Sequence, residues 1–186
     1  MSNDTQLPIE LQKLGETRFA ALYPEQQNQQ QIERLLALSD FAWRSLSSQP
    51  ALLSWLLCEH EIKSREILDP FAQLDITKIE ESECHKLLRQ YREKYWLKVA
   101  FLDLCCKNPI ENSIKYISEL ANKLIDSANQ WAYKNVAKTN GEPLDEHNNP
   151  LPLMVLGMGK LGGQELNYSS DIDLIFAYPR NVKTQG

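Results

Sequence analysis

The chain has 186 residues, which is enough for one domain with room for a small second one. Lys and Arg total 20 against 25 Asp and Glu, and the net charge of −5 argues against a protein that holds nucleic acid by bulk charge. Hydrophobic residues make up 42% of the sequence, yet no apolar run nears the roughly 18 residues of a membrane span. We therefore expect a foldable protein without a nucleic-acid or membrane partner.

The cysteines indicate neither a disulfide framework nor a metal site. None of the four belongs to a Cys-x-x-Cys pair, and Cys84-His85 has no partner pair at zinc spacing. Residues 1–6 lack the basic and apolar segments of a secretory signal. Reduced thiols in the cytoplasm are therefore expected.

Residues 1–140 are predicted to form a series of helices. The first follows Pro8 and ends near Tyr23-Pro24, and the glutamine-rich residues 26–31 form a linker or polar first turn before the second. Ser39-Asp40 offers an N-cap for a third helix over residues 41–46. A fourth helix is predicted to open at Pro50 and run through Leu57.

Two longer helices are predicted next. Thr77 and Glu80 have capping-box spacing ahead of a helix over residues 80–106. The last helix follows Asn108-Pro109 and ends at Asn140-Gly141. Its apolar residues recur with spacing 4-3-4-3-4-3, which predicts one buried face: Ile110, Ile114, Ile117, Ala121, Leu124, Ala128 and Trp131, widened by Leu120, Ile125 and Ala132.

The pattern changes after residue 140. A polar, turn-rich link leads to two short apolar runs, residues 151–156 and 171–178, which are predicted strands. Two strands form too small a sheet to be stable alone, and they leave unpaired edges and half an apolar face. The predicted fold is therefore mainly α, followed by the start of an incomplete α+β region.

The loop between these strands holds four of the seven glycines in the chain. Gly157-x-Gly159-x-x-Gly162 after a strand fits a dinucleotide-binding fingerprint, but Asp171 comes only 14 residues after Gly157, which leaves no room for a full crossover helix. A P-loop is excluded because Leu161 follows Lys160 where Ser or Thr is needed. Binding of NAD is therefore only a distant alternative.

Paired aspartates after the glycine loop favour a different chemistry. On a strand, Asp171 and Asp173 share one face, with their Cα atoms roughly 6.5–7 Å apart. Two such carboxylates can hold two divalent cations for phosphoryl or nucleotidyl transfer, and Mg²⁺ suits a site with few carboxylates. Gly162-Gly163 would let the backbone approach phosphates, and a short helix opening near Gln164 would direct free N–H groups at them.

Residues 156–176 have the sequence Leu-Gly-Met-Gly-Lys-Leu-Gly-Gly-Gln-Glu-Leu-Asn-Tyr-Ser-Ser-Asp-Ile-Asp-Leu-Ile-Phe. This stretch resembles the signature of the bacterial glutamine synthetase adenylyltransferase/adenylyl-removing enzymes. This family belongs to the DNA polymerase β-like nucleotidyltransferases. The similarity extends upstream through residues 38–41, residues 88–94 and Val99-Ala100. The resemblance implies a helical region, residues 1–140, and the first, truncated part of the adenylyl-removing nucleotidyltransferase domain, residues 141–186.

The resemblance also implies roles for individual residues. By this resemblance Asp171 and Asp173 would be metal ligands, and Gly162, Gly163 and Ser170 would form the nucleotide- or phosphate-contacting turn. Lys160 is either a further contact in that turn or a solvated loop lysine. Glu165 and Asn167 match the signature, but their residue types do not separate catalysis from holding the short helix in place.

The implied activity is that of a bifunctional enzyme, of which this chain is the N-terminal part. The adenylyl-removing half uses phosphate to strip AMP from a tyrosine of glutamine synthetase, yielding ADP, whereas the other half attaches AMP from ATP. Mg²⁺ is the implied metal, and glutamine synthetase and the nitrogen signal-transduction protein are the implied partners. The superfamily's third carboxylate comes from a later strand, so this chain alone is expected to be inactive. The alternative is a non-catalytic helical interaction module.

Overall fold

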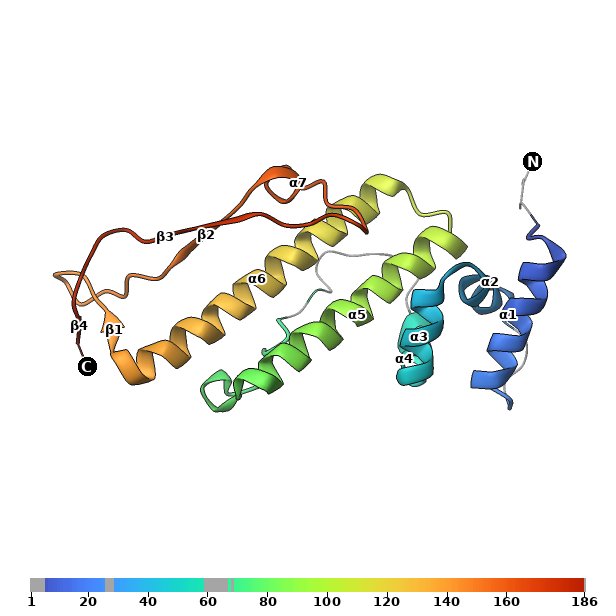
Figure 1. The fold of residues 1–186 in the computed structure, drawn as a ribbon, viewed down its shortest axis with the longest axis horizontal. Helices are drawn as coiled ribbons and strands as arrows, with labels where there is room; N and C mark the ends of the chain where they lie inside the picture. Colours follow the sequence, from blue (N-terminus) through green and yellow to red (C-terminus); the bar gives the residue numbers. More distant parts are fainter. Residues whose placement is uncertain (1–5, 26–28, 59–66, 68, 186) are drawn as a thin grey trace. The chain divides into compact units, whose positions relative to one another are not determined.

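The computed structural model describes residues 6–25, 29–58, 67 and 69–185, and these are mostly helical, as predicted. The first four helices are short, and two long helices follow them (Figure 1). Their bounds are α1 (Ile9–Leu22), α2 (Gln30–Leu38), α3 (Asp40–Ser48), α4 (Leu52–Cys58), α5 (Glu81–Cys105) and α6 (Ile110–Asn140). The remaining elements are a 3-10 turn (Ile76–Lys78), β1 (Glu142–Pro143), β2 (Met154–Gly157), the one-turn α7 (Gly159–Gly162), β3 (Leu174–Ala177) and β4 (Thr184–Gln185). The prediction of a mainly α chain followed by the start of an α+β region is confirmed.

The chain divides into two compact units. The described residues within 1–62 and 93–113 form the N-terminal unit, and those within 63–92 and 114–186 form the C-terminal unit. Each of the long helices α5 and α6 therefore contributes to both units. A separate division into residues 1–140 and 141–186 stays a prediction. No described helix combines the length and apolar character that a membrane crossing requires.

The N-terminal unit is built around a continuous apolar core. Leucine-rich stripes on α2 and α5 provide most of it, because residues three and four apart share a helix face. Its buried members are Phe19, Tyr23, Ile32, Leu35, Leu36, Ala42, Leu46, Leu53, Leu56, Leu97, Ala100, Phe101 and Leu102. Trp43 and Trp55 pack partly buried against this cluster.

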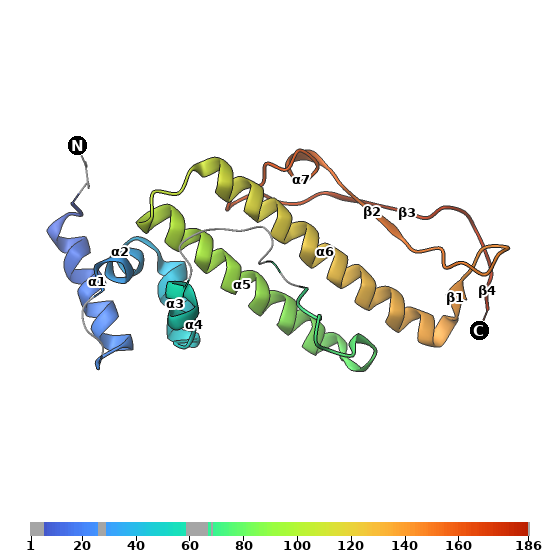
Figure 2. The same ribbon diagram turned by 180° about the vertical axis from the view of Figure 1, so that it is seen from behind.

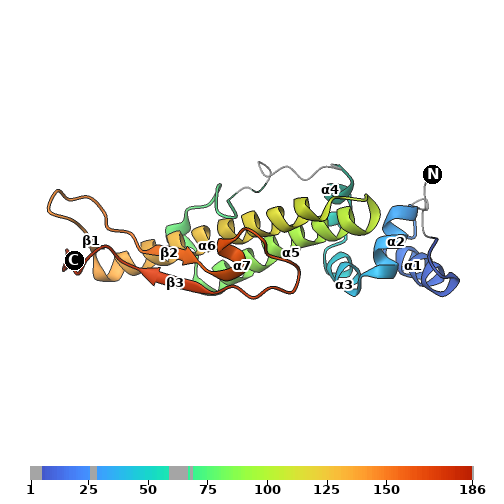
Figure 3. The same ribbon diagram turned by 90° about the horizontal axis from the view of Figure 1, so that it is seen from above.

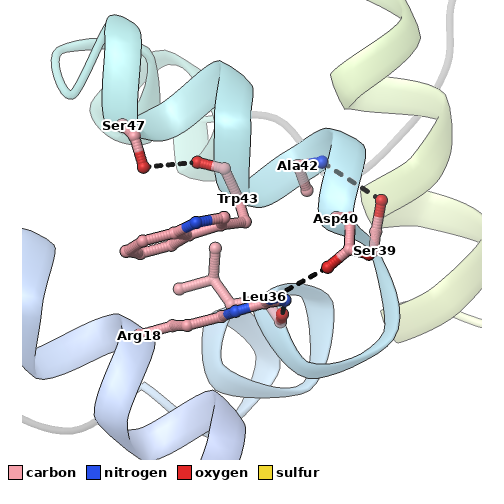
Figure 4. Close-up of polar contacts among 7 residues, drawn as sticks. All are labelled: Arg18, Leu36, Ser39, Asp40, Ala42, Trp43 and Ser47. Atoms are coloured by element: carbon pink, nitrogen blue, oxygen red, sulfur yellow. Dashed lines mark hydrogen bonds and ion pairs between the residues drawn. The ribbon is translucent and has the colours of Figure 1, made fainter.

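A single arginine joins the first three helices (Figure 4). The Arg18 guanidinium on α1 donates to the Leu36 carbonyl at the end of α2 and to the Asp40 carboxylate, each at 2.7 Å. It also lies 5.4 Å from the centre of the Trp43 ring. The predicted N-cap of α3 is confirmed, since the Ser39 hydroxyl accepts from the Ala42 N–H at 3.1 Å.

The C-terminal unit relies on donors along one face of α6. Ser127 donates to the Asp69 carboxylate at 3.0 Å, and the Trp131 indole donates to the Ile79 carbonyl at 2.9 Å. Asn135 and Lys138 continue this face and donate to carbonyls of the 3-10 turn Ile76–Lys78. Trp131, predicted only as a core residue, therefore also satisfies a backbone carbonyl.

The predicted seam of α6 is buried only in part. Ile117 and Leu120 are buried, but Ile110 is 57% exposed and Ala132 is also exposed. Three serines on the same helix are buried in addition: Ser113, Ser118 and Ser127. Hydrogen bonds to other segments explain this pattern, which apolar spacing alone does not predict. The end of α6 is as predicted: Gly141 has a φ of 75°, and its N–H is bonded to the Ala137 carbonyl. The chain continues from this end of α6 into β1 (Figure 2).

The predicted capping box at Thr77 and Glu80 is wrong. Thr77 lies within the 3-10 turn, where its N–H and hydroxyl both donate to Asp75. The Glu80 carbonyl instead accepts from the Cys84 N–H at 2.9 Å, so α5 opens at Glu81. Because the Asp75 carboxylate accepts both of these hydrogen bonds, Thr77 does not cap α5.

Two antiparallel strand pairs complete the C-terminal unit. In β2–β3, Met154 is opposite Ala177 and Gly157 is opposite Leu174, with the strands side by side (Figure 3). β1 pairs with β4 in a second, two-residue ladder. Large apolar side chains of β2 and β3 are exposed: Met154, Leu156, Ile175 and Phe176, at 47%, 50%, 48% and 60%.

A glycine at the α1–α2 contact generates a stability prediction. A Cβ at Gly15 would lie 2.3 Å from the Glu33 carbonyl oxygen. Replacing a helical glycine by alanine ordinarily raises the free energy of unfolding by about 1 kcal/mol. We expect Gly15→Ala to reverse that sign and lower the free energy of unfolding by about 1–3 kcal/mol, because the helices must separate.

Urea unfolding followed by circular dichroism measures this change. Thr17→Ala is the control, since Thr17 is exposed on the same helix and its replacement should alter stability by no more than about 0.5 kcal/mol. A more stable Gly15→Ala protein would show that α1 and α2 are not in close contact there.

Candidate functional site

The two predicted metal ligands lie immediately before β3. The strand begins at Leu174, so neither Asp171 nor Asp173 is within it. The Met158 N–H donates to the Asp173 carbonyl at 2.9 Å, which extends the β2–β3 ladder by one bond and fixes the backbone of Asp173. A shared face for the two side chains stays a prediction, because strand alternation does not extend to Asp171.

Both carboxylates are free to bind a ligand. Asp171 and Asp173 are exposed, and within the described part of the chain no ion pair or side-chain hydrogen bond engages either one. Mg²⁺ commonly takes one or two protein carboxylates and keeps several waters, so this pair fits such an ion. No group of three or more His, Cys, Asp or Glu side chains that could hold a metal occurs among the described residues.

The glycine loop is shaped by close packing within the chain. A Cβ at Gly162 would lie 2.7 Å from the Gly157 carbonyl oxygen, and one at Gly157 would lie 2.8 Å from the Leu161 side chain. Leu161 is itself buried. Gly157 and Gly162 therefore allow α7 to fold back onto the end of β2, which is a structural reason for two of the clustered glycines.

The predicted helix near Gln164 is wrong. The helical turn is α7, which begins earlier at Gly159 and ends at Gly162. Gln164 follows it with a φ of 59°, a left-handed conformation that stops helix propagation. Gly163 is in an ordinary right-handed conformation as the C-cap of α7.

A turn built around Asn167 leads into Asp171. The Asn167 side-chain oxygen accepts from the Ser169 N–H at 3.1 Å and from the Ser170 hydroxyl at 2.9 Å. The Asn167 N–H donates to the Ser170 hydroxyl oxygen at 3.0 Å. These contacts show that Asn167 shapes the turn before Asp171, whereas the short helix α7 ends earlier, at Gly162.

The turn limits what Ser170 can offer a ligand. Its one hydroxyl proton is directed at Asn167, and its oxygen already accepts one bond. One acceptor position on the oxygen remains.

Lys160 is exposed on α7, and its carbonyl accepts from the Glu165 N–H at 2.8 Å. All the predicted site residues therefore lie on one continuous loop between β2 and β3.

A residue that sequence reasoning missed supports this loop. The buried Ser118 hydroxyl on α6 accepts from the Leu166 N–H at 3.0 Å and donates to the Ile114 carbonyl at 2.9 Å. A serine inside a helix gives no sequence signal of this kind, because its partner lies 48 residues away.

The cysteines are consistent with inert thiols. Cys84, Cys105 and Cys106 are free, and burial raises the pKa of the Cys105 thiol to about 12. The Cys105 thiol donates to the Gln31 carbonyl at 3.1 Å. Cys58 ends α4, but its side chain lies outside the described residues.

Sequence comparison places the chain in a known nucleotidyltransferase family. The family model described as glutamate-ammonia ligase adenylyltransferase matches residues 29–186, so the chain belongs to this family.

Relatives of the chain carry the name bifunctional glutamine synthetase adenylyltransferase/adenylyl-removing enzyme. The protein from Shewanella woodyi is 39% identical over 177 residues, which cover 91% of this chain and 19% of the relative. The Psychromonas ingrahamii protein is 39% identical over 84% of this chain and 17% of its own length. The Pasteurella multocida protein is 37% identical, with 84% and 16% covered. The chain thus spans about a fifth of the length of these relatives.

Neighbouring glycines provide a test of the loop geometry. We expect Gly162→Ala to lower stability by about 1–3 kcal/mol, because the new Cβ meets the Gly157 backbone, which has little freedom to move. Thermal unfolding and hydrogen exchange of residues 157–166 measure the effect.

Gly163→Ala is the matched control. Its Cβ would meet only the flexible Glu165 side chain, at 3.2 Å, and its φ of −79° suits alanine. Equal effects of the two substitutions would contradict the described packing of α7 on β2.

Proposed function

We propose that this chain forms the N-terminal part of a bifunctional enzyme that adenylylates and deadenylylates glutamine synthetase, and that it belongs to the adenylyl-removing half. The exposed, unpaired carboxylates of Asp171 and Asp173 carry the proposal. Family membership and the names of the relatives give further support.

The proposed reaction is phosphorolysis of adenylyl-tyrosine. An oxygen of inorganic phosphate attacks the phosphorus of the AMP group and forms a new P–O bond. The bond from that phosphorus to the tyrosine oxygen breaks, the tyrosine oxygen takes a proton, and ADP is released. Asp171 and Asp173 would hold Mg²⁺, which would supply electrostatic stabilisation of the charge that develops on the phosphate oxygens.

The glycine loop has a positioning part in this proposal. Gly162 and Gly163 are exposed and would bring backbone close to the nucleotide phosphates, with Ser170 and Lys160 as further contacts. Ser170 would contribute through its remaining acceptor position, since its proton is held by Asn167. ATP would serve the opposite, adenylylating reaction elsewhere in the whole enzyme.

We further propose that the 186-residue chain alone is inactive. Two carboxylates are an incomplete metal set for this superfamily, and among the described residues no third joins them. The proposed setting is the cytoplasm, with glutamine synthetase as the protein substrate and the nitrogen signal-transduction protein as a regulatory partner. Nucleic acid and membranes have no part in the proposal.

Substitution of the aspartates tests the proposal. In the intact enzyme that contains this chain, Asp171→Asn or Asp173→Asn should lower deadenylylation by more than about 100-fold, because charge stabilisation in the transition state is lost. The fold should be retained, since both side chains are exposed. ADP release from adenylylated glutamine synthetase is the measurement.

Asp126→Asn is the control, because Asp126 is an exposed carboxylate on α6. It should leave ADP release unchanged. Phosphorolysis at the wild-type rate by either site variant would contradict the metal role, and would favour a non-catalytic interaction module.

A further inference from the structure

One buried hydroxyl links α6 to the loop that carries the aspartates. Ser118 has no exposed surface, and its oxygen accepts a hydrogen bond from the Leu166 N–H. Leu166 is itself only 3% exposed. The Ser118 proton is directed at the Ile114 carbonyl, so the oxygen is oriented as an acceptor. Loss of this oxygen would leave a buried backbone N–H without its partner, which costs more than the bond itself contributes.

The link continues from Leu166 to Asp171 through consecutive contacts. Asn167 follows Leu166 and holds the Ser169 N–H and the Ser170 hydroxyl on its side-chain oxygen. The Ser170 N–H returns to the Asn167 carbonyl at 3.2 Å. Asp171 is the next residue, so its backbone begins at the end of a turn anchored on α6.

Asp173 has a separate support. Its carbonyl accepts from the Met158 N–H as an extension of the β2–β3 ladder. The two aspartates are therefore held from different sides, Asp173 by the strand pair and Asp171 by the Asn167 turn. Their relative placement depends on both supports being present.

We propose that Ser118 is a positioning residue for the metal site: through Leu166 and the Asn167 turn, it sets Asp171 against Asp173 so that both carboxylates reach the same divalent cations. The inference rests on the proposed metal role of these aspartates. Ser118 is fully buried, so it acts through the loop and not by touching substrate.

The chain supplies a closely matched control on the same helix. Ser127 is 1% exposed, and its single hydroxyl proton is shared between the Lys123 carbonyl at 2.8 Å and the Asp69 carboxylate at 3.0 Å. Asp69 is far along the chain from the glycine loop. Ser118→Ala and Ser127→Ala therefore make the same chemical change, and only the first removes a support of Asp171.

Mn²⁺ binding to the intact enzyme, measured by calorimetry, tests the inference without relying on catalysis. Ser118→Ala should weaken Mn²⁺ binding about fivefold, the equivalent of one hydrogen bond of about 1 kcal/mol. Ser127→Ala should bind Mn²⁺ as the wild type does. Hydrogen exchange of residues 166–171 should accelerate in Ser118→Ala alone.

A second variant keeps the test valid if Ser118→Ala fails to fold. Asn167 is exposed, so Asn167→Ala should fold, and it should weaken Mn²⁺ binding by at least the same factor. Wild-type Mn²⁺ affinity in Ser118→Ala, or equal weakening in Ser127→Ala, would overturn the positioning role alone. Mn²⁺ binding that Asp171→Asn leaves intact would overturn the metal site and this inference with it.

Discussion

Hydrogen bonds from side chains of α6 to irregular segments hold the C-terminal unit in order. Segments without regular structure have backbone groups that find no partner in a ladder or a helix, and burial makes each unpaired group costly. Trp131 satisfies a carbonyl of the segment before α5, and Ser118 satisfies an N–H of the glycine loop. One long helix thus supports two stretches of chain that are far apart in the sequence.

This arrangement explains why polar residues interrupt the apolar face of α6. A purely apolar face would bury more hydrocarbon, but it would leave the carbonyls and N–H groups of the neighbouring segments unpaired. Ser118 and Ser127 are small enough to be fully enclosed and still bond both their own helix and a neighbour. The hydrogen bond from the Leu166 N–H to Ser118 thereby fixes the glycine loop against α6.

The exposed apolar side chains of β2 and β3 accord with a sheet of only two strands. Leu156 and Ile175 are opposite one another, and each remains about half exposed. Such a face ordinarily packs against a further layer. The chain covers about a fifth of the length of its relatives. The proposed reaction is therefore assigned to the whole enzyme and not to this chain alone.

The sequence by itself determined the elements whose signals are local. Pro8, Ser39 and Gly141 mark helix ends through their own backbone or side-chain chemistry, and the structure confirms all three. The aspartate pair and the glycines also stand out by type and spacing. The sequence did not determine the hydrogen bonding of Thr77, the position of α7 or the role of Ser118. Thr77 bonds Asp75 instead of capping α5, and the other two depend on segments that meet only in the folded chain. Only the tertiary structure brings Ser118 to Leu166 and Gly162 to Gly157, since hydrogen bonding and steric contact act over distances that sequence spacing does not encode.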